Sequence, residues 1–323
     1  MDHPMTTAFV LTGGGSLGAV QVGMLQALSE RGITPDLLVG TSCGALNAAW
    51  VAGQGMSRDS LSELARVWTS LRRSDLFPVD ARQVLRGLAG LSPAVVSNRK
   101  LRQFIHAHAS IHDLAKAQVP TYLVAADLLS GRDVLISTGD LSTGVLASCA
   151  IPGVLPPVEH AGAQLIDGAL ARHAGIAQAV DLGASVVYIL PTGAACALPR
   201  PPRSAAGAAL HSLTLLIQQR LIHETATLQA ATTIKLLPPL CPLAVSAADF
   251  SHAEELITRA HRSSLEWIDS GGTELAEPER FLSLHHHDRV PGIAPQTSTR
   301  PRVSQPHRSR GDSPSPQVDS CAR

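Results

Sequence analysis

The sequence predicts a three-layer α/β/α fold with a mainly parallel sheet, and two glycine-rich segments near its start are the main reason. Gly13-Gly14-Gly15-Ser16-Leu17-Gly18 follows the apolar run 7–12, and Gly40-Thr41-Ser42-Cys43-Gly44 follows the apolar run 37–40. Each apolar run is typical of a buried strand, and a helix is expected after each glycine segment. Alternating strands and helices are typical of parallel βαβ units. We therefore expect the first two strands to lie side by side in parallel.

The two helices of this first unit are expected over 19–30 and 42–51. Both are rich in small residues, which allow a helix to pack closely on a sheet, and Gly32 and Gly53 mark where they end. The first fifty residues are thus predicted to form strand, helix, strand and helix in that order.

A helical insertion is predicted over about 57–118, directly after the second helix. Apolar residues recur at helical spacing in 59–71, and shorter helical pieces follow in 80–88 and 98–106. A segment in this position could form a lid or one wall of a substrate groove, and a purely structural role is the alternative.

The second half of the chain is predicted to alternate between strands and helices, with one hairpin. The Ser130-Gly131 turn between two β-compatible runs predicts the hairpin, and Asp167-Gly168-Ala169 follows a later short strand. The predicted strands are 120–126, 132–137, 164–166, 185–190 and 232–237, and the predicted helices are 140–150, 176–182, 205–230 and 252–268.

We predict one domain over residues 1–284 and a disordered tail over residues 285–323. The tail is rich in Pro, Ser and Arg and has no aromatic residue. Such a composition buries too little apolar surface to offset the conformational entropy lost on folding.

Composition excludes some classes of function. Lys and Arg together number 26, as do Asp and Glu, and only 3% of residues are aromatic, so a nucleic-acid binder is not expected. The five scattered cysteines lack zinc-like spacing and favour buried thiols. No segment approaches the roughly 18 apolar residues of a membrane span. Residues 1–10 have no Lys or Arg, so a secretory signal is not expected. These features predict a cytoplasmic protein and leave peripheral, transient contact with a membrane surface open.

The first glycine segment fits two kinds of chemistry. Gly13, Gly15 and Gly18 match the G-x-G-x-x-G of dinucleotide-binding enzymes. That fingerprint needs an acidic residue at the end of the second strand for the ribose, whereas Asp36 precedes this strand. The other use of such a loop is to direct backbone N–H groups at the oxyanion of an acyl-transfer reaction.

The second glycine segment matches the G-x-S-x-G pattern of a nucleophile elbow, which would expose the hydroxyl of Ser42. If the two strands are neighbours, the backbone amides of 13–15 lie beside Ser42 and form an oxyanion hole, with each donor worth about 3 kcal/mol. The competing interpretations are that Ser42 only caps a helix and that Asp167 only stabilises a turn.

Three ordered motifs resemble those of the patatin-like phospholipases. They are the G-G-G-x-x-G loop at 13–18, the G-x-S-x-G elbow at 40–44 and the D-G-[GA] turn at 167–169. Residues 147–153 and the following Pro156-Pro157 also resemble the family's segment before its acidic residue. The resemblance covers roughly residues 7–190.

This resemblance implies a serine lipid acyl hydrolase that cleaves acyl esters of phospholipids or related lipids. Ser42 would attack the ester carbonyl, and Asp167 would take its proton directly, without a histidine. An ordinary carboxylate is a weak base, so Asp167 is expected to be partly buried. The dyad needs no metal and no cofactor, and the implied partner is the lipid substrate. The implied oxyanion-hole residues are Gly13, Gly14, Gly15 and Gly18, and the implied supporting residues are Gly40, Gly44 and Gly168.

Two departures from the family pattern keep alternatives open. His173 and Gly175 stand where the family usually has Asn and Pro, and Cys43 stands where it usually has Ala or Gly. Cys43 could be a second nucleophile, and His173 or His160 could complete a triad. Asp127 is the best substitute base. A patatin-fold binding protein with weak or no activity is the remaining alternative.

Overall fold

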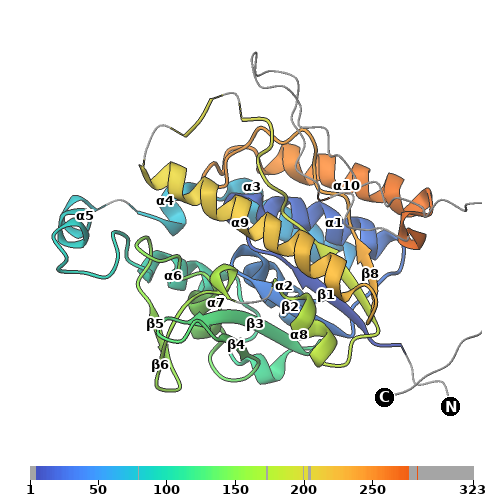
Figure 1. The fold of residues 1–323 in the computed structure, drawn as a ribbon, viewed down its shortest axis with the longest axis horizontal. Coiled ribbons are helices and arrows are strands. Elements are labelled where there is room, and N and C mark those ends of the chain that lie inside the picture. The colour runs from blue at the N-terminus through green and yellow to red at the C-terminus, as the bar shows by residue number, and fades with distance from the viewer. Residues whose placement is uncertain are drawn as a thin grey trace, which may run out of the picture. The chain divides into compact units, whose positions relative to one another are not determined.

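The central feature of the structure is a mixed sheet with strand order β5-β6-β3-β2-β1-β7-β8, in which β4 also pairs with β3 (Figure 1). The structure is a computed structural model, and it describes residues 5–275, except 79, 172–173, 199 and 203–204, together with Leu282. The strands are β1 (Thr7–Leu11), β2 (Leu37–Thr41), β3 (Thr121–Asp127), β4 (Asp133–Ile136), β5 (Val158–His160), β6 (Ala163–Asp167), β7 (Val186–Leu190) and β8 (Thr233–Leu236).

The helices lie on both faces of this sheet. They are α1 (Gly18–Glu30), α2 (Cys43–Gln54), α3 (Arg58–Ser70), α4 (Arg73–Leu76), α5 (Ala81–Leu88), α6 (Arg99–His108), α7 (Leu141–Ser148), α8 (Ile176–Asp181), α9 (Ala205–Leu228) and α10 (Ala253–Asp269). Short 3-10 turns are formed by Gly15–Leu17, Leu114–Lys116, Gly168–Leu170 and Gly272–Glu274.

The alternation of side chains along the strands creates two hydrophobic cores. Phe9 and Leu11 of β1 pack into one core with α1, α2, α3 and α10, whereas Val10 and Val39 pack into the other with α8 and α9. Figure 1 shows α1, α3 and α10 side by side on the first face. Strands β1, β2, β3, β7 and β8 pair in parallel, and β4, β5 and β6 add antiparallel pairs at one side. The predicted three-layer fold with a mainly parallel sheet is confirmed.

One pairing detail decides where the site lies. Along β3, the residues up to Val124 pair with β2 on one side, and β4 pairs with Leu123–Ala126 on the other side. From Ala125 onward β3 pairs with β6, which must therefore occupy the side that β2 has left. The carboxyl ends of β2 and β6 thus meet at consecutive positions of β3.

Most sequence-based element boundaries agree with the structure to within three residues. The short helix α4 and the edge strand β5 were not predicted, because four and three residues are too few to show a period. Four helices and one 3-10 turn lie between α2 and β3, in the segment predicted as a helical insertion. The predicted tail, 285–323, lies outside the described residues, and the domain boundary at 284 stays a prediction.

Candidate active site

The turn between β2 and α2 holds Ser42 in a strained backbone conformation. Ser42 has φ 54° and ψ −121°, a combination that non-glycine residues rarely adopt and that is found chiefly at functional sites. A Cβ on Gly40 would come within 2.8 Å of the Ala48 Cβ, and a Cβ on Gly44 would collide with the Leu11 carbonyl oxygen. Glycine is therefore required on both sides of Ser42, because the helix starts in direct contact with the sheet.

The hydroxyl of Ser42 donates a hydrogen bond to Asp167, with 2.7 Å between Oγ and Oδ2. Asp167 ends β6, and its other oxygen, Oδ1, accepts a hydrogen bond of 2.8 Å from the backbone N–H of Ala169. A Cβ on Gly168 would collide with the Val124 carbonyl oxygen, so this turn lies directly against β3. Both residues are buried, with Ser42 7% and Asp167 1% exposed.

The strand register explains why these two residues meet although 125 positions separate them in the chain. Thr41, the last residue of β2, is opposite Val124 of β3, and Asp167 is opposite the next residue, Ala125. Ser42, the first residue after β2, therefore lies beside Asp167, the last residue of β6.

Burial changes the chemistry of the Asp167 carboxylate. It raises the pKa of Asp167 from an ordinary 3.8 to about 6, while the hydrogen bonds from Ala169 and Ser42 act in the opposite direction. A carboxylate with a pKa of about 6 is a stronger base than an ordinary one and is still ionised at neutral pH.

The glycine loop lies directly beside the serine. A Cβ on Gly13 would be 3.2 Å from the Ser42 Cβ, and a Cβ on Gly14 would collide with the Thr192 side chain. Gly15 has a left-handed φ of 60°. Among the described residues, no carbonyl oxygen accepts a hydrogen bond from the N–H of Gly13, Gly14 or Gly15. The amides of Gly14 and Gly15 are within reach of the Cys43 thiol, and Gly13 lies directly beside Ser42, so the predicted oxyanion hole stays a prediction.

Gly18 differs from the other three glycines predicted to line the oxyanion hole. Its N–H already donates to the carbonyl oxygens of Gly15 and Ser16. A Cβ on Gly18 would come within 2.6 Å of the Trp68 ring. This contact favours a role in close packing between α1 and α3, and the place of Gly18 in the oxyanion hole stays a prediction.

Cys43 follows the serine directly but is not set up as a nucleophile. Burial, the larger effect, and the nearby Asp167 carboxylate raise the pKa of the Cys43 thiol to about 12, although the amides of Gly14, Gly44 and Gly15 act in the opposite direction. The reactive form of cysteine is the thiolate, so Cys43 is an unreactive thiol at neutral pH.

Ser148, at the end of α7, holds the elbow in place and was not singled out from the sequence. Its hydroxyl oxygen accepts a hydrogen bond of 2.9 Å from the Ser42 backbone N–H. The same hydroxyl donates to the Val124 carbonyl oxygen at 2.6 Å. One buried side chain therefore connects the elbow to β3, and only its position within the family-like segment 147–153 pointed to it.

A series of buried hydrogen bonds connects α3, α2 and α1 to the backbone beside the glycine loop. The Trp68 indole donates to Asn47 at 2.8 Å, and the Asn47 amide donates to Gln21 at 2.9 Å. Gln21 then donates to the carbonyl oxygens of Thr12, directly after β1, and Leu190, the last residue of β7. Buried amides that satisfy one another in this way fix the spacing of the helices and strands around them.

The other candidate residues lie elsewhere. His173 is outside the described residues. His160 is on the edge strand β5, where it pairs with Ala163. The carboxylate of Asp127 accepts hydrogen bonds from the backbone and hydroxyl of Ser130, as a turn residue does, and these bonds lower its pKa. Gly175, in place of the family's Pro, starts α8 with a left-handed φ of 104°.

Two side chains of α9 hold the segment that follows Asp167. The Arg220 guanidinium donates to the carbonyl oxygens of Ala169, at 3.0 Å, and Ala171. One turn further, the buried Glu224 carboxylate accepts hydrogen bonds from the N–H groups of Ala174, at 2.5 Å, and Ala177, at 2.7 Å. This clamp acts where the chain departs from the family pattern, and nothing in the sequence connected α9 with Asp167.

We expect Arg220→Ala to reduce ester hydrolysis by about tenfold, mainly through kcat, because a turn that is less well held positions its carboxylate poorly. The Ala169 N–H lowers the pKa of Asp167, so weakening that contact should also move the acid limb of the pH–rate profile to higher pH. Gln219→Ala, at an exposed position of the same helix, is the matched control. An unchanged acid limb in a folded Arg220→Ala protein would show that the clamp does not act on Asp167.

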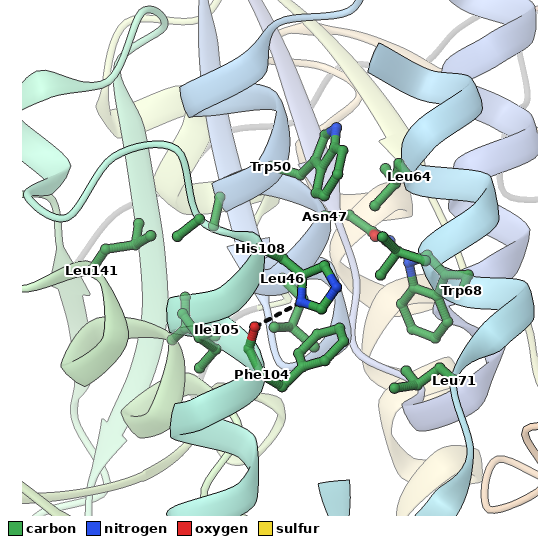
Figure 2. Close-up of a pocket in the computed structure, with 14 residues that line it drawn as sticks. Leu46, Asn47, Trp50, Leu64, Trp68, Leu71, Phe104, Ile105, His108 and Leu141 are labelled. Atoms are coloured by element: carbon green, nitrogen blue, oxygen red, sulfur yellow. Dashed lines mark hydrogen bonds between the residues drawn. The ribbon is translucent and has the colours of Figure 1, made fainter. Parts of the chain in front are cut away.

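An apolar groove lies beside the elbow helix, between α2, α3, α6 and α7 (Figure 2). Its lining side chains are mostly aliphatic and aromatic, as in many ligand-binding pockets. It contains neither Ser42 nor Asp167, but Leu46 in its wall lies one helical turn after Ser42, and Val145 lies one turn before Ser148. Both helices therefore lead from the groove to the elbow. Figure 2 shows Leu46 of α2 with Phe104 and His108 of α6 among the side chains that line it.

A smaller cavity opens on the other side of the site. It is lined by residues of the glycine loop, the Asp167 turn and α9, among them Gly13, Ala169, Ile217 and Arg220. Within the described part of the chain, no cluster of three or more His, Cys, Asp or Glu residues could bind a metal ion. Among the same residues, every helix is too short or too polar to cross a lipid bilayer.

The fold and these contacts define the class: an α/β protein with a serine elbow, a glycine loop and a buried carboxylate at one edge of its sheet. The family model of the patatin-like phospholipases matches residues 9–180, and the chain belongs to this family. The predicted membership is confirmed.

Relatives and solved structures are similar to parts of the chain. An uncharacterized NTE family protein of Mycobacterium tuberculosis is 30% identical over 161 residues, which are 50% of this chain and 26% of that protein. The human patatin-like phospholipase domain-containing protein 6 is 30% identical over 190 residues, 58% of this chain and 13% of that protein. The chain therefore matches only a minor part of each. The crystal structure of VipD from Legionella pneumophila aligns with a TM-score of 0.41 at 14% identity, covering 86% of this chain and 67% of VipD.

Proposed function

We propose that this protein is a serine lipid acyl hydrolase that uses Ser42 as the nucleophile and Asp167 as the base. The observation that supports this most directly is the 2.7 Å hydrogen bond between Ser42 Oγ and Asp167 Oδ2, made by a serine in a strained elbow. Nucleophile and base within hydrogen-bond reach of each other are the signature of an activated serine.

The proposed reaction has two steps. Ser42 Oγ attacks the ester carbonyl carbon as its proton passes to Asp167, and the carbonyl oxygen becomes negative next to the amides of 13–15. The tetrahedral intermediate collapses, the alcohol leaves with that proton, and an acyl ester remains on Ser42. Water then attacks this ester, gives a proton to Asp167, and the fatty acid is released as Ser42 recovers its hydrogen.

The apolar groove supports a lipid as the substrate. Its walls are formed by aliphatic and aromatic side chains that an acyl chain can pack against, and it begins one turn from Ser42 along α2. An acyl chain bound there would extend between α3 and α6, away from the ester carbonyl. Family membership supports the same substrate class.

The dinucleotide hypothesis receives no support from the site. The strand end that should present the ribose-binding acid is occupied by the elbow, and the loop amides face a serine and a cysteine. A binding protein without activity is the outcome that the following experiment separates from a hydrolase.

The test combines covalent labelling with an acyl-ester panel. A fluorophosphonate probe should label Ser42, located by peptide mapping, and the protein should release fatty acid from phosphatidylcholine vesicles. Soluble esters with longer acyl chains should have a higher kcat/KM than acetyl esters, because the groove can hold the chain. The absence of both labelling and turnover would favour the inactive binding protein. Turnover of acetyl esters alone would contradict a lipid substrate.

A further inference from the structure

The helix α5 is unusual because it buries none of its residues. Figure 1 shows it projecting from the other helices. Leu85, Leu88 and Leu91, on this helix and the turn that follows it, are 69%, 76% and 68% exposed. Single exposed leucines are common on protein surfaces, but three within seven residues of one projecting hairpin form an apolar patch that water solvates poorly.

The segment of the chain that carries this leucine tip, which we define as Leu85, Leu88 and Leu91, is strongly basic. The segment 72–102 has seven basic residues, namely Arg72, Arg73, Arg82, Arg86, Arg99, Lys100 and Arg102, against two acidic ones, Asp75 and Asp80. Its formal charge is therefore 7 − 2 = +5, in a chain whose total is zero. Arg82 and Arg86 are exposed on α5 itself, one turn apart. Apolar side chains flanked by arginines suit an interface between anionic headgroups and acyl chains.

The hairpin is connected to the active site by hydrogen bonds. The Gln83 side chain donates to the Ala94 carbonyl oxygen at 3.0 Å. This bond holds α5 against the turn that follows it. Directly after Ala94, the N–H groups of Val95 and Val96 donate to the carbonyl oxygens of Gly153 and Val154, at 3.1 and 2.9 Å.

The loop that contains Gly153 and Val154 also contacts the candidate base, Asp167. Ala150, three residues before Gly153, accepts a hydrogen bond of 3.0 Å from the Asp167 backbone N–H. The leucine tip is thus connected by hydrogen bonds to the loop that contacts the candidate base.

We propose that α5 and its turn form an interfacial anchor that inserts the leucine tip into lipid surfaces containing anionic phospholipids. The arginines would pair with the headgroups while the leucines enter the acyl-chain boundary. The anchor would hold the active-site edge against the membrane, so the substrate ester would reach Ser42 without leaving the lipid phase. The place of the anchor in catalysis rests on the proposed function, but its binding to lipid does not.

The test measures binding separately from hydrolysis. Ser42→Ala protein, which cannot consume the lipid, is co-sedimented with phosphatidylcholine vesicles with and without phosphatidylglycerol. We expect stronger binding to the anionic vesicles and weaker binding as salt is raised. Leu85→Ser, Leu88→Ser and Leu91→Ser, combined in one variant, should lower the partition coefficient by about tenfold or more. Arg82→Gln with Arg86→Gln should lower it about tenfold on anionic vesicles alone.

Matched controls come from other exposed positions. Leu129→Ser, at a residue 91% exposed in the turn between β3 and β4, should bind as the parent does. Arg66→Gln, on the surface of α3, should also bind normally. In the active background, the triple leucine variant should lose vesicle hydrolysis but keep its rate on a water-soluble short-chain ester.

Several outcomes would overturn the anchor. The first is undiminished vesicle binding by the triple leucine variant. The second is a loss of vesicle binding in the Leu129→Ser control equal to that in the triple variant. The third is self-association of the protein through the leucine tip in place of lipid binding. Hydrolysis of soluble esters without vesicle binding would reject the anchor and leave the hydrolase standing. Vesicle binding that depends on the leucine tip, in a protein with no esterase activity, would reject the hydrolase and leave the anchor standing.

Discussion

Ser42→Ala should lower kcat/KM for ester hydrolysis by at least about a thousandfold, because no other group of the site is placed to form the acyl intermediate. The fold should be kept, since alanine needs no more space than serine and the elbow is held by backbone contacts and by Ser148. Hydrolysis rates on a soluble ester measure the loss of activity, and circular dichroism and thermal unfolding of the same samples show whether the fold is kept.

Cys43→Ala is the matched control for this prediction. It removes the neighbouring side chain, whose thiol is protonated at neutral pH, and should retain most of the activity. If Cys43→Ala were inactive and Ser42→Ala retained turnover, the assignment of the nucleophile would be reversed. Fluorophosphonate labelling should be lost in Ser42→Ala and kept in Cys43→Ala.

Asp167→Asn should abolish hydrolysis and at the same time stabilise the protein at neutral pH. The amide cannot take the serine proton, so the loss of activity should be comparable to that in Ser42→Ala. In the wild type, kcat/KM should rise with pH through about 6, as Asp167 ionises, and this limb should be absent from any residual activity of the variant.

The gain in stability follows from the direction of the pKa change. At a pH below 3.8, Asp167 is protonated in both the folded and unfolded chains, and its burial costs little. As pH rises through about 6, the wild type loses the stability that this raised pKa represents, about 3 kcal/mol for a rise from 3.8 to about 6. Asparagine stays neutral, so denaturant unfolding should show the variant to be more stable above pH 6 and equal to the wild type at about pH 4. Equal stability at both pH values would contradict a strongly raised pKa.

The sequence predicted that Ser42 and Asp167 act as a pair, and their catalytic roles stay a prediction. The structure shows the two side chains in hydrogen-bond contact, for which the sequence did not contain the reason. Ser42 and Asp167 each follow a strand and each lie beside a glycine, and these local signals were sufficient to select them. Their meeting depends on β3, which pairs with β2 up to Val124 and with β6 from Ala125. Strand order and register arise from long-range pairing, which local periodicity does not encode.

The residues missed from the sequence are the ones that support the dyad. They are Ser148, Arg220 and Thr192, whose hydroxyl donates to the Gly13 carbonyl oxygen at 2.7 Å, and all three occur in stretches whose local pattern is an ordinary helix or loop. They act on parts of the chain from about 50 to 180 positions away. A polar side chain acquires such a role only when tertiary packing brings it to an orphaned backbone group.

The sequence by itself determined the chemistry of the loops in this protein. Gly15, Gly40, Gly44 and Gly168 are needed because backbone atoms approach where a Cβ would stand, and Gly15 also has a left-handed φ. Such glycine requirements are visible in the sequence itself. Tertiary structure decided the rest: which strand end faces Ser42, how deeply Asp167 is buried, and that α5 stands free of the core. Each of these depends on burial and pairing between distant segments, which exist only once the sheet has assembled.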